Sequence, residues 1–110
     1  MTIAEVLDAE AAQLHGVERR AVGGGVEWLA DGVAFAALAG EIAEFRLSPV
    51  VAAAARATPD AGASGRGDQW VAFNPPQLDR YALDRAVAWF GSAYRAAASG
   101  KSRESERPRS

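Results

Sequence analysis

The sequence of 110 residues contains no cysteine and only one histidine, His15. Without cysteine the chain cannot form a disulfide, a thiolate zinc site or a catalytic thiol, and a single histidine excludes a multi-histidine metal site. No apolar run approaches the ~18–20 residues that cross a bilayer, and no basic stretch precedes an apolar one at the N-terminus, as it would in a signal peptide. We therefore expect a cytoplasmic domain that uses no cofactor and does not enter a membrane.

Composition and charge divide the chain into two parts. With 49 % hydrophobic and 24 % charged residues, the whole resembles an ordinary globular protein. Residues 1–98 hold eight arginines and twelve acidic residues, a net charge of −4, whereas residues 99–110 carry a net charge of +2. That last segment has no apolar side chains with which to form a core. The sequence therefore predicts one domain over 1–98 and a disordered polar tail over 99–110.

Three helices are expected. Thr2 and Glu5 have capping-box spacing, which predicts a first helix over 3–14 that ends near Gly16. Ser48-Pro49 predicts the start of a short second helix that ends before Pro59. A third helix is expected over 78–98, where one apolar stripe recurs at helical spacing: Leu83, Val87, Phe90, Tyr94 and Ala97.

Short strands separated by glycine-containing turns are expected between the first two helices, over 17–22, 26–29, 33–38 and 41–47. The last of these alternates most clearly, with Phe45 facing one side and Glu44 and Arg46 the other. A loop over 60–68 precedes a fifth strand over 70–73. These elements predict an α+β fold in the order α-β-β-β-β-α-β-α. About five strands form an antiparallel meander sheet, with three helices packed on one face.

Catalytic motifs fail on inspection. Ser64 lies in a sequence one residue away from a nucleophile elbow, but Arg66 replaces the glycine that the sharp turn requires. Lys101 follows a glycine as in a phosphate-binding loop, yet Arg95 stands where the first glycine of that motif belongs. His15, at the end of the first helix, is most simply a solvated side chain. No set of groups supports catalysis, which favours a protein that is not an enzyme.

The remaining candidates are binding surfaces. Trp28 and Arg46 are candidates for a surface that contacts a partner protein or a small ligand. In an alternative hypothesis, Arg19, Arg20, Arg66 and the basic tail bind nucleic acid weakly. The net charge of −4 over residues 1–98 argues against that alternative, because nucleic-acid-binding domains usually carry basic stripes.

Two segments, 68–73 and 85–94, resemble the closing part of the small luciferase-domain proteins, which lie near the MmcQ/YjbR-like group. In those proteins a Trp-Val strand is followed by a helix that ends in a Ser-Tyr or Ala-Tyr pair, as Trp70-Val71 and Ala93-Tyr94 do here. The resemblance implies a curved antiparallel sheet packed against helices. It also implies DNA binding through two hairpin wings, which would be the turns at 23–25 and 30–32. Asp31 in the second turn opposes that role, because a wing needs basic residues near phosphates.

Overall fold

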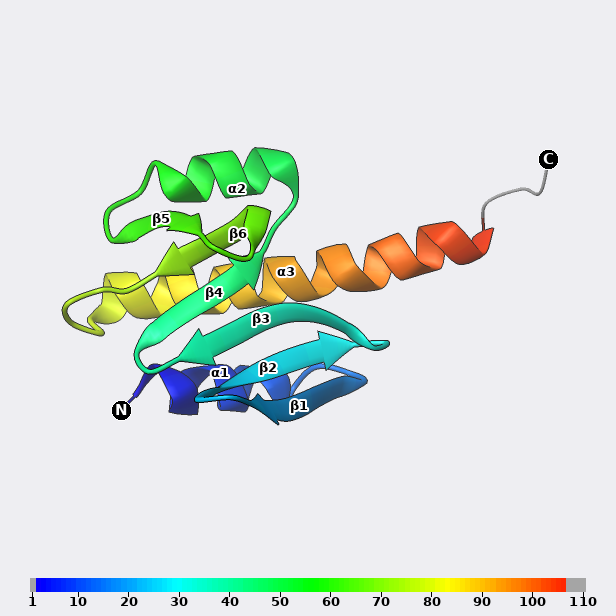
Figure 1. Ribbon diagram of the computed structural model, residues 1–110, viewed down its shortest axis with the longest axis horizontal. Helices are drawn as coiled ribbons and strands as arrows, with labels where there is room; N and C mark the ends of the chain where they lie inside the picture. The colour runs from blue at the N-terminus through cyan, green and yellow to red at the C-terminus, as the bar shows by residue number, and fades with distance from the viewer. Residues whose placement is uncertain (1, 107–110) are drawn as a thin grey trace.

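The computed structural model describes the backbone of residues 2–106 and the side chains of residues 2–98. Its fold is α+β, as predicted (Figure 1). Three helices and six strands follow one another along the chain: α1 (Ile3–Ala11), β1 (Val17–Val22), β2 (Gly25–Ala30), β3 (Val33–Ala39), β4 (Ile42–Arg46), α2 (Pro49–Arg56), β5 (Ala61–Ser64), β6 (Gly67–Phe73) and α3 (Arg80–Glu106).

The six strands form one antiparallel sheet in the order β1-β2-β3-β4-β6-β5. The first four strands are the predicted meander, and β6 joins it by pairing with β4. One row of the sheet passes through Glu27, Ala37, Glu44 and Ala72, which are opposite one another on β2, β3, β4 and β6. Because side chains alternate along a strand, this row points away from the core, and we call that side of the sheet the open face.

The core lies on the other side of the sheet. Phe45 on β4 and Phe73 on β6 are fully buried there, and the edge of each ring contacts Trp89 of α3. Phe90, the next residue of α3, makes edge-on contacts with Trp28 and Phe35, with ring centroids 5.6 and 5.2 Å apart. In Figure 1, α1 and α3 run behind the sheet and α2 lies beside β5. The buried residues of all three helices belong to one cluster, as the packing on one face predicts.

The buried face of α3 differs from the predicted stripe. Leu83, Val87 and Tyr94 are only partly buried, and the most buried side chains are mostly small: Ala82, Ala86, Trp89, Phe90, Ala93 and Ala97. The small alanine side chains leave room between the helix and the sheet for the two large rings of Trp89 and Phe90. The prediction therefore placed the contact face of this helix a fraction of a turn away.

Several boundaries also differ from the predicted ones. Residues 60–68, predicted to be a loop, contain β5 and the start of β6, so the sheet has six strands rather than five. Pairing with β6 overrides the weak strand propensity of Ala61–Ser64. The first helix ends at Ala11, three residues before its predicted end.

The last helix runs through Glu106, into the segment for which the sequence predicts disorder. Lysine, arginine and glutamate in that segment have high helix propensity, so a helix can continue past its buried face. Residues 107–110 lie outside the described residues. Within the part of the chain that the structure describes, no helix is both long and apolar enough to cross a membrane.

Candidate anion-binding site

A cleft of about 450 Å³ opens where the end of β4, the start of α2 and the second half of α3 meet. Its polar lining consists of Arg46, Ser48, Gln69 and Arg95. Its apolar lining consists of Phe35, Leu47, Pro49, Ala93, Ala96 and Ala97. The volume lies within the range of ~300–1,000 Å³ that is usual for small-molecule sites.

The local sequence explains why the cleft forms. Alternation along β4 buries Phe45 and Leu47 and leaves Arg46 exposed at the strand end. Pro49 then begins α2 at once, so the chain turns towards α3. The α3 residues opposite this turn are alanines, whose small side chains leave the space between the two helices unfilled.

The cleft is rich in unpaired donors. Neither Arg46 nor Arg95 makes a hydrogen bond or an ion pair with any described residue. Ser48 caps α2 by its backbone position, but its hydroxyl makes no capping hydrogen bond. The first turn of α2 holds no acidic residue, so its free N–H groups add partial positive charge.

The residues that line the cleft are suited to binding an anion and not to catalysing a reaction. Two arginines, a serine and a glutamine line one cleft, and among the described residues no carboxylate or imidazole lines it. Guanidinium groups bind carboxylates and phosphates through charge-assisted hydrogen bonds. Among the described residues, no three His, Cys, Asp or Glu side chains are grouped so that they could hold a metal ion.

Of the two residues predicted to form a ligand or partner surface, only Arg46 is at this cleft. Trp28 is fully buried, so the prediction of an exposed surface around it is wrong. Its ring packs against Phe90, and its indole N–H donates to Asp8 Oδ1 at 3.3 Å. The Asp8 side chain is itself partly exposed, so the indole N–H has an acceptor at the edge of the core while the rest of the ring is buried.

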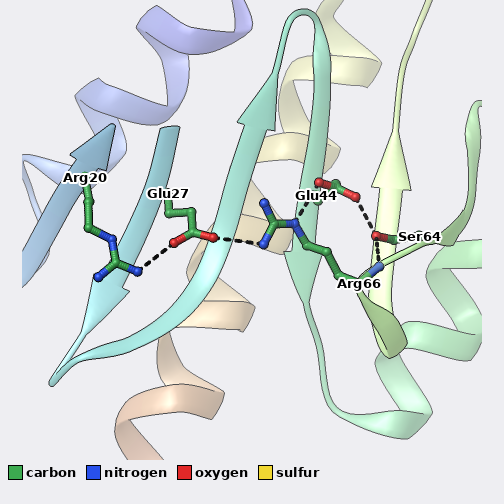
Figure 2. A network of polar contacts seen from close by, with 5 residues as sticks. All are labelled: Arg20, Glu27, Glu44, Ser64 and Arg66. Atoms are coloured by element: carbon green, nitrogen blue, oxygen red, sulfur yellow. Dashed lines mark hydrogen bonds and ion pairs between the residues drawn. The ribbon is translucent and has the colours of Figure 1, made fainter. Parts of the chain in front are cut away.

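Arg20 and Arg66, candidates for nucleic-acid contact, belong to an ion-pair network on the open face (Figure 2). Arg66 projects from the β5–β6 turn and places Nε 2.9 Å from Glu44 and Nη1 2.9 Å from Glu27. Arg20 lies 2.9 Å from the other oxygen of Glu27. Since Glu27 and Glu44 both lie beside Ala37 in the sheet, the Arg66 guanidinium crosses that alanine, which is 1 % exposed.

The network alters the titration of its members. Hydrogen bonds from Arg20 and then from Arg66 hold the pKa of Glu27 below its ordinary value. The hydrogen bond to Glu44 is the largest cause that raises the pKa of Arg66. Arg20 and Arg66 are therefore already paired with carboxylates on the open face.

Arg19, the third candidate, lies apart from the other two. Its Nε is 3.0 Å from Asp8 Oδ1, the oxygen that also accepts from Trp28. Since neighbouring strand residues point to opposite sides, Arg19 faces the helices while Arg20 faces the open side. The structure thus brings Arg20 and Arg66 together through Glu27 and leaves Arg19 on the other face.

Ser64 has a polar partner that its sequence context did not indicate. Its hydroxyl donates a hydrogen bond to Glu44 and accepts one from the backbone N–H of Arg66 (Figure 2). Glu44 is at the same time paired with Arg66. This serine therefore stabilises the β5–β6 turn.

Sequence reasoning missed Arg95, Ser48 and Gln69 as members of a site. The sequence pattern indicates only that Ser48 caps a helix. For Arg95 it indicates only that this residue stands where a phosphate-binding motif requires a glycine. A usable signal was present on α3, where an arginine adjoins a face made of alanines. Gln69 carried no signal, because only the pairing of β6 with β4 brings it to the cleft.

Comparison with known proteins does not assign the chain to a family. No family model, curated protein or solved structure matches the chain. The resemblance of residues 68–73 and 85–94 to the luciferase-domain proteins accordingly stays a prediction.

Proposed function

We propose that this protein is a small binding domain, not an enzyme, whose ligand is a small anion-bearing molecule held in the α2–α3 cleft. The observation that carries the proposal is the pair Arg46 and Arg95, which line one cleft without a carboxylate partner among the described residues. A bound anion would supply the acceptors that these two side chains lack.

The surrounding charges support the same ligand class. Residues 1–98 are acidic overall, yet the described residues that line the cleft include two cations and no anion. A cleft of one charge sign in a protein of the opposite sign concentrates the field at one place, which favours capture of the oppositely charged ligand. Without an acid or base in the lining, binding rather than turnover is the activity that these residues support.

Nucleic-acid binding, the alternative, has less support. Arg19, Arg20 and Arg66 each pair with a carboxylate, so phosphate contacts would have to break existing ion pairs. Titration with a mixed-sequence DNA duplex at low salt tests this alternative. Amide shifts over residues 19–31 that fade as salt rises would favour it over the cleft.

The proposed function is tested by NMR titration with inorganic phosphate and with acetate, at constant ionic strength set by chloride. We expect amide shifts at Ser48 and the first turn of α2, and a shift of the Arg95 side-chain N–H. Arg46→Gln and Arg95→Gln should each weaken binding about 10-fold, since a hydrogen bond to a charged group contributes ~1.5–3 kcal/mol when buried and less when exposed.

The matched control is Arg80→Gln, which removes an exposed arginine at the start of α3, outside the cleft lining. It should leave the affinity within a factor of two. Equal losses in all three variants would mean that only the net charge matters, and that result would overturn the proposal.

A further inference from the structure

We infer that the ligand is an amphipathic acid, a carboxylate that carries a short hydrocarbon chain, an inference that rests on the proposed function. The donors in the cleft adjoin a wall with no polar side-chain atoms. That wall consists of Pro49 from α2 and of Ala93, Ala96 and Ala97 from α3.

The accessible part of the wall lies along its rim. Pro49 and Ala96 are exposed, whereas Phe35 and Leu47 lie beneath the floor and are 0 and 1 % exposed. A hydrocarbon chain would therefore lie along the helices and would not enter the core. A chain in this position would be covered on one side only, so each methylene contributes less than it would in a closed pocket.

An exposed apolar residue follows the wall residue Pro49 in the sequence. Val50 follows Pro49 directly and is 81 % exposed, the most exposed of the large hydrophobic residues in the described part of the chain. Single exposed valines are common on protein surfaces. This one lies in the first turn of α2, next in sequence to a residue that lines the cleft.

The chemistry of the lining separates this ligand from other anions. Inorganic phosphate would use the arginines and leave the apolar wall in water. A nucleotide would need polar partners for its sugar and base, and beyond the arginines the lining offers only Ser48 and Gln69. An acid with a short alkyl chain satisfies both kinds of lining at once.

The experiment measures the affinity of the full chain for acetate, butyrate and hexanoate by NMR titration, with butanol and hexanol as uncharged counterparts. We expect the affinity to rise about twofold for each added methylene. This factor corresponds to about half of the transfer free energy of a fully buried methylene, because the hydrocarbon chain is covered on one side only. The alcohols should bind at least about 10-fold more weakly than the acids of equal length, since they lack the charge that the arginines recognise.

A pair of variants tests where the hydrocarbon chain of the ligand lies. Ala96→Asn makes the wall polar and should abolish the dependence on chain length while leaving acetate affinity within a factor of two. Ala88→Asn places the same side chain at an exposed position of the same helix, outside the cleft lining. It should behave like the wild-type protein and controls for the effect of asparagine on the helix.

The outcomes distinguish this inference from the proposed function. If acetate binds and the longer acids bind no better, the amphipathic ligand is overturned and the anion site stands. If the affinity of the Ala96→Asn variant still rises fully with the length of the hydrocarbon chain, that chain lies elsewhere and the assigned wall is wrong. If neither the acids nor phosphate binds, the proposed function itself fails.

Discussion

The guanidinium of Arg95 lies over Gly91, one turn earlier on α3. A Cβ atom at Gly91 would stand 3.1 Å from Arg95 Nη1, and the three nearest atoms to that position all belong to the guanidinium. Glycine in the middle of a helix is less favourable than alanine by ~0.5–1 kcal/mol. At this position the missing side chain leaves space for the second arginine of the cleft.

Gly91→Ala is therefore expected to raise the stability of the protein while it lowers the affinity for phosphate. The helix should gain about 1 kcal/mol from the better helix former, while the Arg95 guanidinium must move by a few tenths of an ångström. We expect phosphate affinity to fall about twofold, a small change because arginine side chains are flexible. Urea unfolding and phosphate titration measure the two effects. Ala88→Gly is the reverse control, and it should lower stability by a similar amount without changing the phosphate affinity. If the Gly91→Ala variant binds phosphate as tightly as the wild-type protein does, the absence of a side chain at Gly91 does not matter for the position of Arg95.

The pairing of Glu27 makes stability depend on pH in the acid range. Its pKa in the folded state is lowered from the ordinary value of 4.5, so the unfolded state binds the proton more tightly. The resulting stabilisation is complete well above pH 4.5 and is lost as the pH falls through the lower, folded-state pKa. Glu27→Gln should reduce the loss of stability between pH 6 and pH 3, measured by urea unfolding at each pH.

Glu5 requires a separate control in that measurement. Its pKa is also lowered, chiefly by a hydrogen bond from the backbone of Thr2 in the capping box. Because Glu5 is exposed in the first turn of α1, water and salt screen its charge and reduce its contribution to stability. Glu5→Gln should therefore change the pH profile less than Glu27→Gln does. A larger effect from Glu5 would show that the network on the open face is not the main acid-labile element.

Removal of Arg66 should cost more than an exposed ion pair usually does. Its side chain is 32 % exposed and bridges two carboxylates whose side chains are only 13 and 16 % exposed. We expect Arg66→Gln to lower the free energy of unfolding by about 1–2 kcal/mol, above the ~0–1 kcal/mol of a surface pair. A double-mutant cycle with Glu44→Gln measures the coupling. A coupling energy near zero would mean that Arg66 and Glu44 act independently.

Arg85 is expected to be a larger contributor to stability. Its side chain is 11 % exposed, stacks on the rings of Tyr81 and Phe73, and donates to Thr58 and to the Pro59 carbonyl. These contacts attach the α2–β5 loop to α3. Arg85→Ala should therefore lower the free energy of unfolding by about 2–3 kcal/mol. Arg80→Ala, an exposed arginine in the same helix, should change it by less than ~0.5 kcal/mol; equal effects would contradict the structural role of Arg85.

The meander was predictable because its signals are local. Glycines mark the turns, and alternation in β4 correctly assigns Phe45 to the core and Glu44 to the opposite face. Ala61–Ser64 carries no such signal, since a run of small residues becomes a strand only when β6 lies beside it. The contact face of α3 was predicted only in part: Phe90 and Ala97 of the predicted stripe are buried, but the rest of the face consists mainly of alanines, which hydrophobic periodicity weights less than leucine and valine.

The candidate site was less predictable than the fold. Arg46 could be singled out from the alternation of β4, but its neighbours in the cleft come from β6 and α3, far along the chain. The prediction for Trp28 failed because composition alone does not show which tryptophan can be buried with an acceptor for its indole N–H. In the structure, Asp8 of α1 supplies that acceptor.

The strand order has a consequence for how the chain folds. Every neighbouring pair in the sheet is consecutive in sequence except β4 and β6, which are separated by α2 and β5. The first four strands and the β5–β6 hairpin can thus each form by closing short loops, whereas joining them requires a longer loop closure. The pairing of β4 with β6 at this seam also brings Gln69 to the cleft, so the proposed binding site is expected to be among the last features to form.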